Sequence, residues 1–224
     1  MKLLLALDSS PVSQRILEEV IARPWPSETE FCIVSAVDVG RFSELPALIA
    51  DAKRECEKIV KAGAALLAQA KLHATTKVLS GSPRRVVSDY AANWNADLIV
   101  LGSHGRGAIG RFLLGSVAQG ILRTANCSVE IVRFPASDRA PSSHPMKLFL
   151  PTDGSACSLA AARFLAARPW PAGSIVKIVS VEELVTKRDW NSCARETACA
   201  TAWSDAWSDA QSIFRNPVFE EERE

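Results

Sequence analysis

Residues 97–116 read DLIVLGSHGRGAIGRFLLGS, and this stretch decides both the expected fold class and the expected binding site. An apolar run typical of a buried strand leads into a glycine-rich segment, and a helical pattern follows over residues 117–123. Glycines allow the backbone to approach a phosphate closely, and the free N–H groups at a helix start favour anionic oxygens. The order strand, glycine loop, helix therefore predicts a phosphate-binding loop, with Arg106 and Arg111 adding positive charge.

The glycine spacing in this stretch is Gly102-x2-Gly105-x9-Gly115-Ser116. It matches neither the G-x-G-x-x-G of dinucleotide-binding folds nor the G-x-x-x-x-G-K-[ST] of P-loop enzymes. The sequence therefore does not support NAD binding or an ordinary P-loop NTPase. The structural alternative is that the glycines only form a tight turn between a strand and a helix.

Apolar runs alternate with helical patterns along residues 1–134, which predicts an α/β fold: an open five-stranded parallel sheet with helices on both faces. Right-handed crossovers give the strand order 3-2-1-4-5, with the ligand cleft between strands one and four. The expected strands are Lys2–Leu7, Phe31–Val37, Ala74–Leu79, Asp97–Leu101 and Ser128–Phe134, and the expected helices are Ser10–Ala22, Glu44–Lys71, Pro83–Asn93 and Gly115–Thr124.

The chain repeats itself at an offset of 145 residues. The segment Arg23-Pro24-Trp25-Pro26 returns as Arg168-Pro169-Trp170-Pro171, and Asp8-Ser9-Ser10 returns as Asp153-Gly154-Ser155. We expect a first domain over residues 1–134, a polar and proline-rich linker over 135–145, and an incomplete second copy over 146–224 with the order strand, helix, strand, helix. At this offset the second copy contains no counterpart of the glycine loop, so it is not expected to form a phosphate-binding site by itself.

Composition excludes several classes of protein. The 224 residues carry a formal net charge of +1 without clustered Lys and Arg, so a nucleic-acid partner is not expected. No apolar stretch is long enough for a membrane span, and we expect a cytoplasmic protein. The six cysteines show no C-x-x-C pair and no zinc-ligand spacing with the three histidines, so reduced thiols and no bound metal are expected.

Several polar and glycine positions fall at one predicted edge of the sheet. Asp8 and Ser10 follow the first strand, and Val37 ends the second. Gly102 and Gly105 follow the fourth strand. Ligands of open parallel α/β sheets bind at the carboxyl ends of the strands, close to the switch in strand order. The edge therefore is the predicted ligand site, although Asp8 and Ser116 would also suit helix caps and Val37 an ordinary strand position.

The glycine spacing and its surroundings resemble the universal stress protein family, whose ATP-binding members carry G-x2-G-x9-G-[ST] after the fourth strand. The opening segment 1–10, MKLLLALDSS, resembles the family's first strand and D-x-S turn, and residues 127–133, CSVEIVR, resemble its closing strand. The resemblance covers about residues 1–134. Ala108 departs from it, since many members have glycine there.

The resemblance implies an ATP site, with or without Mg²⁺, and a role for each matching residue. Asp8 and the Val37 backbone would hold the adenine or its ribose, with Ser10 beside them. Ala6 and Leu101 would form an apolar wall. The ribose and phosphates would be surrounded by Gly102, Gly105, Arg106, Gly115, Ser116 and Val117.

Three functions remain open from the sequence. The first is a nucleotide-binding regulatory protein of the stress response, without enzymatic activity, in which ATP occupancy biases conformation or dimerisation and so the response of a signalling partner. The second is an ATP-using enzyme of a related α/β nucleotide fold, which the lack of H-x-G-H and S-G-G-x-D-S motifs disfavours. The third is a dimerisation module that binds no nucleotide. A homodimer or an intramolecular pseudo-dimer is expected, since Trp203 and Trp207 form a stripe that needs cover.

Overall fold

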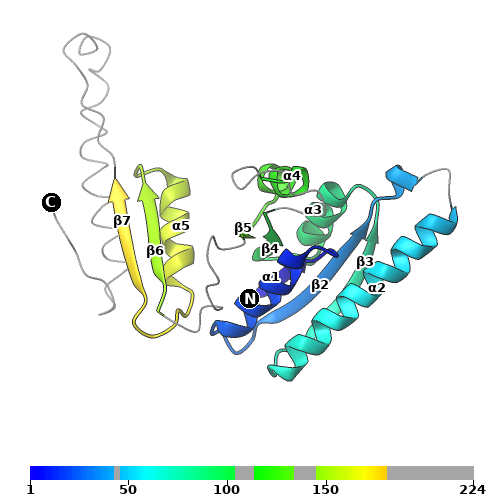
Figure 1. Ribbon diagram of the computed structural model, residues 1–224. Helices are drawn as coiled ribbons and strands as arrows, with labels where there is room; N and C mark the ends of the chain where they lie inside the picture. The colour runs from blue at the N-terminus through cyan, green and yellow to red at the C-terminus, as the bar shows by residue number, and fades with distance from the viewer. Residues whose placement is uncertain (43–45, 104–113, 134–144, 181–224) are drawn as a thin grey trace, which may run out of the picture. The chain divides into compact units, whose positions relative to one another are not determined.

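A five-stranded parallel sheet in the order β3-β2-β1-β4-β5 forms the centre of the first part of the chain (Figure 1). The computed structural model describes residues 1–42, 46–103, 114–133 and 145–180. The strands are β1 (Lys2–Ala6), β2 (Glu30–Val37), β3 (Ala74–Ser80), β4 (Leu98–Gly102) and β5 (Ser128–Val132). The order 3-2-1-4-5 expected from the sequence is confirmed, because β1 pairs with both β2 and β4.

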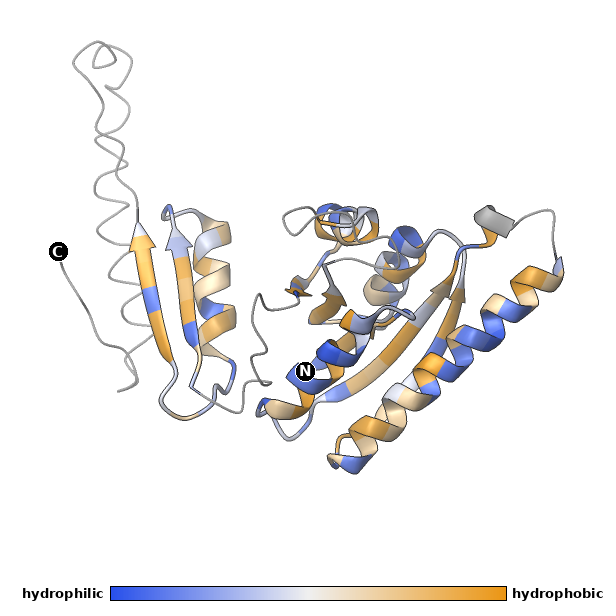
Figure 2. Ribbon diagram, viewed as in Figure 1, coloured by the Kyte–Doolittle hydropathy of each residue, from blue (hydrophilic) through white to orange (hydrophobic). Residues whose placement is uncertain are grey.

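Helices cover both faces of this sheet. They are α1 (Pro11–Ala22), α2 (Pro46–Gln69), α3 (Pro83–Trp94) and α4 (Ser116–Thr124), and a short 3₁₀ helix, η1 (Val39–Phe42), follows β2. Helices α1 and α2 pack together on one face, where a Cβ added to Gly63 of α2 would lie 3.1 Å from Leu7 and 3.2 Å from Ile33. Hydrophilic and hydrophobic residues alternate along α2, as expected for a helix with one buried side (Figure 2).

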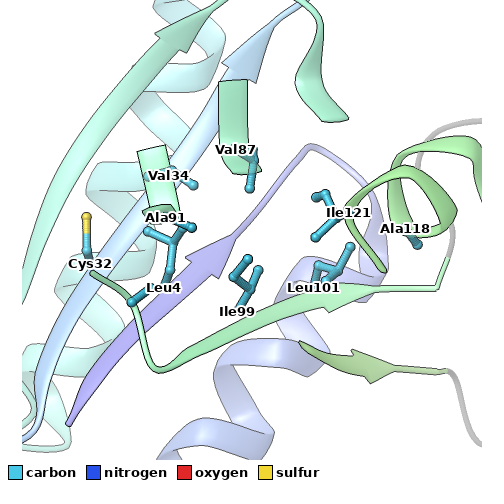
Figure 3. Close-up of a cluster of buried hydrophobic side chains, with 10 residues drawn as sticks. Leu4, Cys32, Val34, Val87, Ala91, Ile99, Leu101, Ala118 and Ile121 are labelled. Carbon is cyan, nitrogen blue, oxygen red and sulfur yellow. The ribbon is translucent and has the colours of Figure 1, made fainter. Parts of the chain in front are cut away.

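The other face is covered by α3 and α4. There the inward side chains of β1, β2 and β4 meet the buried sides of the two helices (Figure 3), in a cluster of Leu4, Cys32, Val34, Val87, Ala91, Ala96, Ile99, Leu101, Ala118 and Ile121. The central strands are buried on both faces, which explains why they read as unbroken apolar runs in the sequence. The expected boundaries agree with the observed ones to within about two residues.

A largely buried chain of ion pairs joins α1 to the edge strand β5. Glu19 accepts from Arg15 at 2.6 Å and from Arg23 at 3.3 Å. Arg23 also donates to Glu130 of β5 at 2.6 Å, and its own side chain is only 10% exposed. The end of α1 is therefore tied to β5 through one guanidinium group that serves two carboxylates.

The second part of the chain forms its own small unit, as the division of the chain into 1–141 and 142–224 indicates. Strand β6 (Lys147–Thr152), helix α5 (Ala156–Ala166) and strand β7 (Ile175–Ser180) follow each other. The two strands are parallel. The expected helix after β7, with Trp203 and Trp207, and nearly all of the expected linker lie outside the described residues.

The contacts of this second unit repeat those of the first at the offset of 145 residues. Lys2 pairs with Glu30 in the first unit, and Lys147 pairs with Ile175 in the second. The Ser155 N–H donates to Asp153 at 3.0 Å, as the Ser10 N–H does to Asp8. Hydrogen bonds from the Ser155 and Ser158 groups lower the pKa of Asp153 to about 2. The repeat seen in the sequence is therefore also a repeat of local structure.

None of the helices in the described ranges is long and apolar enough to cross a membrane.

Candidate functional site

The carboxyl ends of β1, β2 and β4 meet at a cleft of about 420 Å³. The segments after these strands line it together with the first turn of α4, two residues of α3 and two residues of α2. Its volume lies in the usual range of small-molecule sites, roughly 300–1,000 Å³. We call this space the cleft. It is lined by Ala6, Leu7, Asp8, Ser10, Ser13, Ala36, Val37, Asp38, Ala52, Cys56, Pro83, Val87, Leu101, Gly102, Ser103, Gly115, Ser116, Val117 and Ala118.

Nine of the eleven residues predicted from the sequence line this cleft. They are Ala6, Asp8, Ser10, Val37, Leu101, Gly102, Gly115, Ser116 and Val117. They come from positions up to 111 residues apart and are brought together because the ends of parallel strands lie at one edge of the sheet. The other two, Gly105 and Arg106, lie outside the described residues.

The Asp8 carboxylate organises the turn between β1 and α1. Its Oδ1 atom accepts hydrogen bonds from the Ser10 N–H at 3.0 Å, from the Ser10 hydroxyl and from the Ser13 hydroxyl at 3.1 Å. The Ser13 hydroxyl in turn accepts from the Asp8 N–H at 2.8 Å. Ser10, not Asp8, is the N-cap of α1. Asp8 therefore stabilises the helix start indirectly, and it also lines the cleft.

The two ends of the glycine-rich segment are joined by backbone hydrogen bonds. The Ser103 N–H donates to the Val132 carbonyl of β5 at 2.8 Å, and the Gly115 N–H donates to the Ser103 carbonyl at 2.8 Å. The base of the loop is thus closed and attached to the sheet. The Gly115 N–H is already used in this closure, so the donors that α4 offers to an anion are those of its first turn, beginning with Ser116 and Val117.

The structure corrects two details of the sequence interpretation at this loop. Gly115 is the N-cap of α4, and Ser116 is the first helical residue, so Ser116 does not cap the helix. Gly115 has φ −62° and ψ 154°, an extended conformation open to other residues. Glycine is therefore not required here for a left-handed backbone.

Val37 is held at the cleft through its carbonyl. This carbonyl accepts the Gly81 N–H at 2.9 Å. Gly81 has φ +139°, and a Cβ at this residue would lie 2.6 Å from a Val86 methyl carbon. Glycine is therefore required here by both backbone conformation and space. The Val37 carbonyl keeps one lone pair for a ligand.

Sequence reasoning missed about half of the lining residues. Asp38 follows Val37 directly, and its place after a strand was a usable signal. Ala52 and Cys56 of α2 gave no such signal, because they read as ordinary positions of an amphipathic helix. Asp8 and Asp38 are the two carboxylates of the described lining, where the sequence suggested one. No group of three or more His, Cys, Asp or Glu side chains suited to a metal occurs among the described residues.

The fold and the cleft define an α/β protein of the open parallel type with a ligand-sized site at the switch point of its sheet. The family model described as "Universal stress protein family" matches residues 1–133, and the chain belongs to this family. The resemblance seen in the sequence is thereby confirmed.

Relatives and solved structures agree with this assignment. A universal stress protein of Methanocaldococcus jannaschii is 30% identical over 143 residues, which are 61% of this chain and 84% of the relative. One of Synechocystis sp. is 28% identical over 151 residues, covering 59% of this chain and 97% of the relative. The fold is similar to that of universal stress protein UspA from Lactobacillus plantarum, with a TM-score of 0.53, 22% identity and coverage of 59% and 97%. The fold is also similar to that of a universal stress protein from Archaeoglobus fulgidus, with a TM-score of 0.62 and 19% identity. The match covers 89% of this chain and 72% of that one.

Proposed function

We propose that the first unit binds ATP in the cleft and acts as a cytoplasmic regulatory protein of the stress response. The observation that carries the proposal is the convergence of nine predicted residues on one cavity of about 420 Å³. A helix N-terminus and glycine backbone at one side suit phosphate oxygens. Apolar walls and carboxylates at the other side suit an adenine ring with its amino group and the ribose hydroxyls.

The proposed orientation follows from the distribution of groups. Ala6 and Leu101 flank the base as apolar walls, and Asp8 and Val37 offer hydrogen-bond acceptors to the base or ribose. The phosphates extend toward Gly102, Gly115, Ser116 and Val117. By sequence, Gly105 and the positive charge of Arg106 belong to the same loop. Mg²⁺, where it accompanies ATP, would be held mainly by phosphates and water, because no three-ligand cluster occurs in the described part of the chain.

In this proposal ATP occupancy favours one conformation or association state, which a signalling partner then recognises. The alternatives are an ATP-using enzyme on the same cleft and a dimerisation module whose cleft stays empty. The test begins with denaturing the purified full chain and identifying any released nucleotide by mass spectrometry. Titration of the nucleotide-free protein with ATP follows.

We expect ATP or ADP in the released fraction and saturable binding of ATP to the nucleotide-free protein. We expect no rapid hydrolysis of the bound ATP. Rapid phosphate release from ATP by the purified protein would favour the enzyme. Absence of both bound nucleotide and ATP binding would overturn the proposal in favour of the dimerisation module.

We further propose that the chain associates, either as a homodimer or as an intramolecular pseudo-dimer, through the second unit. Helix α5 covers one face of the β6–β7 pair, with Leu150, Ala162 and Val176 buried between them. On the other face Phe149 is 64% exposed and Ile175 is 42% exposed. Apolar residues exposed on a two-stranded sheet favour association.

The association prediction can be tested with two protein lengths. A homodimer is expected to sediment with twice the mass of the chain, and an intramolecular pseudo-dimer with the mass of one chain. A variant ending at Pro135 is expected to be more soluble and still to bind ATP. Residues 146–224 expressed alone should not form a stable monomer, because two strands cannot bury both faces of their sheet. A stable monomeric fragment of this length would contradict the argument.

A further inference from the structure

A second cavity, of about 440 Å³, lies at the opposite end of the same sheet from the cleft. Two connections form it: the one between α1 and β2, and the one between α2 and β3. Both connections lead into strands, so the cavity lies at the amino ends of the strands, away from the proposed nucleotide. We call it the Trp25 groove. It is lined by Ile21, Arg23, Pro24, Trp25, Pro26, Ser27, Thr29, Phe31, Ala70, Lys71, Leu72 and His73.

One wall of this groove is an aromatic surface held in place. The Trp25 indole N–H donates to the Val20 carbonyl at 2.7 Å, and the Trp25 ring meets the Phe31 ring edge-on at 6.0 Å. The flanking residues Pro24 and Pro26 restrict the backbone on either side of the tryptophan. An apolar side chain bound against this wall would therefore need little reorganisation of the protein.

The second unit shows that the Arg-Pro-Trp-Pro segment forms this wall by itself. The Trp170 indole N–H donates to the Leu165 carbonyl at 2.8 Å, as Trp25 does to Val20 145 positions earlier. The counterparts of Lys71 and His73 in the second copy are Asn216 and Val218 in the sequence. Thus the repeat keeps the aromatic wall but not the basic residues of the other side.

The ionisable side chains that line the Trp25 groove are Arg23, Lys71 and His73, and none of them is a carboxylate. The charge of Arg23 is balanced by Glu19 and Glu130, so attraction for an anion comes mainly from Lys71, with His73 as a further donor. Lys71 lies in the turn that follows α2, and its backbone has φ +62°. The turn is held by a hydrogen bond in which the Leu72 N–H donates to the Leu67 carbonyl at 2.9 Å. The groove therefore combines a rigid aromatic wall with a cation at its opposite side.

We propose that the Trp25 groove binds a short segment of a partner protein in which an apolar or aromatic side chain is followed by carboxylates. The apolar side chain packs against Trp25, which the buried Phe31 supports from behind, and the carboxylates lie beside Lys71 and His73. A nucleic acid or an anionic membrane needs a broad basic surface, which a chain of net charge +1 without Lys and Arg clusters does not supply. The proposal is independent of the ATP site.

The test is calorimetric titration of the full chain with the peptide acetyl-Ala-Trp-Glu-Glu-amide, a sequence that the chain itself does not contain, and with its neutral match, acetyl-Ala-Trp-Gln-Gln-amide. One site per chain is expected, since the second copy lacks the basic counterparts. The Glu peptide should bind about tenfold more tightly than the Gln peptide, a typical effect for two partly screened charge pairs. The substitution Lys71→Glu should weaken the binding of the Glu peptide about tenfold.

A matched variant controls for net charge. Lys77 is exposed on β3 and does not line the groove, so Lys77→Glu should change peptide affinity less than about twofold. ATP binding should be the same in all three proteins, which separates this proposal from that for the cleft.

Four results would overturn the proposal: equal affinity for the two peptides, no binding of either, equal effects of Lys71→Glu and Lys77→Glu, or two sites per chain. Displacement of the peptide by inorganic phosphate alone would identify a simple anion site instead. Cosedimentation with vesicles containing anionic phospholipid, abolished by Lys71→Glu, would identify a membrane contact instead. Either of these results would also reject the peptide-binding role.

Discussion

Replacing Gly115 by valine is expected to weaken ATP binding about 100-fold, equivalent to ~2.7 kcal/mol, while the first unit stays folded. Gly115 lines the cleft immediately before the first turn of α4. A valine side chain there would occupy space that the phosphates need and would hinder their approach to the N–H groups of Ser116 and Val117. The φ and ψ of Gly115 are −62° and 154°, which valine adopts without strain, so the fold should tolerate the change. Calorimetric titration with ATP measures the effect.

Two further variants separate crowding from a general effect on α4. Gly115→Ala adds one methyl group and should give an intermediate loss of affinity. Ala125→Val places the same side chain at the C-cap of α4, where the backbone is also extended, with φ −68° and ψ 137°. It should leave ATP affinity unchanged because Ala125 does not line the cleft. A folded Gly115→Val protein with normal ATP affinity would refute the proposed site.

Local sequence patterns were sufficient to predict the sheet of the first unit. The strands β1, β2 and β4 are buried on both faces, and such strands appear as unbroken apolar runs such as residues 3–7 and 98–101. Pro11 and Pro83 mark the first residues of α1 and α3, where a missing N–H has no cost. Strand order then followed from the right-handed crossover rule, which leaves few topologies for a chain of this pattern.

Details that depend on several distant segments could not be predicted in this way. The Gly115 N–H donates to the Ser103 carbonyl, and this hydrogen bond depends on how the two ends of the glycine-rich segment meet in the folded chain. Ala52 and Cys56 line the cleft from the first half of α2, and a helical pattern alone does not show which residues of a helix do so. The Trp25 groove likewise requires two connections, more than 40 residues apart in the sequence, to lie side by side.

The repeat gives a further example, because identical residues make different contacts in the two units. Arg23 and Arg168 occupy the same position of the Arg-Pro-Trp-Pro segment. Arg23 pairs with Glu19 and Glu130, whereas Arg168 lies 5.1 Å from the Phe164 ring centre and 5.0 Å from that of Trp170. The residue four positions earlier differs between the units, since it is Glu19 in the first and Phe164 in the second. Sequence identity within a repeat therefore does not imply an identical energetic role.

This difference predicts that Arg23→Ala destabilises the protein strongly and that Arg168→Ala does not. The Arg23 side chain is 10% exposed and pairs with the carboxylates of Glu19 and Glu130. The Glu19 side chain is 11% exposed and that of Glu130 is 22% exposed. Removing the guanidinium leaves largely buried negative charge with fewer partners, which costs about 3 kcal/mol. Arg168→Ala removes the cation–π contacts with Phe164 and Trp170 and should cost about 1–2 kcal/mol, at about 0.5–1 kcal/mol for each contact. Urea unfolding of the full chain, followed by circular dichroism, measures both.

A double variant tests whether the loss comes from the unpaired carboxylate. Glu130→Leu combined with Arg23→Met replaces the Arg23–Glu130 pair by apolar side chains, so it should be more stable than Arg23→Met alone. Arg15 still pairs with Glu19 at 2.6 Å in this variant, so Glu19 keeps one cation. If Arg23→Ala and Arg168→Ala prove equally mild, or if the double variant loses as much as the two single changes added together, the ion-pair chain does not hold α1 to β5.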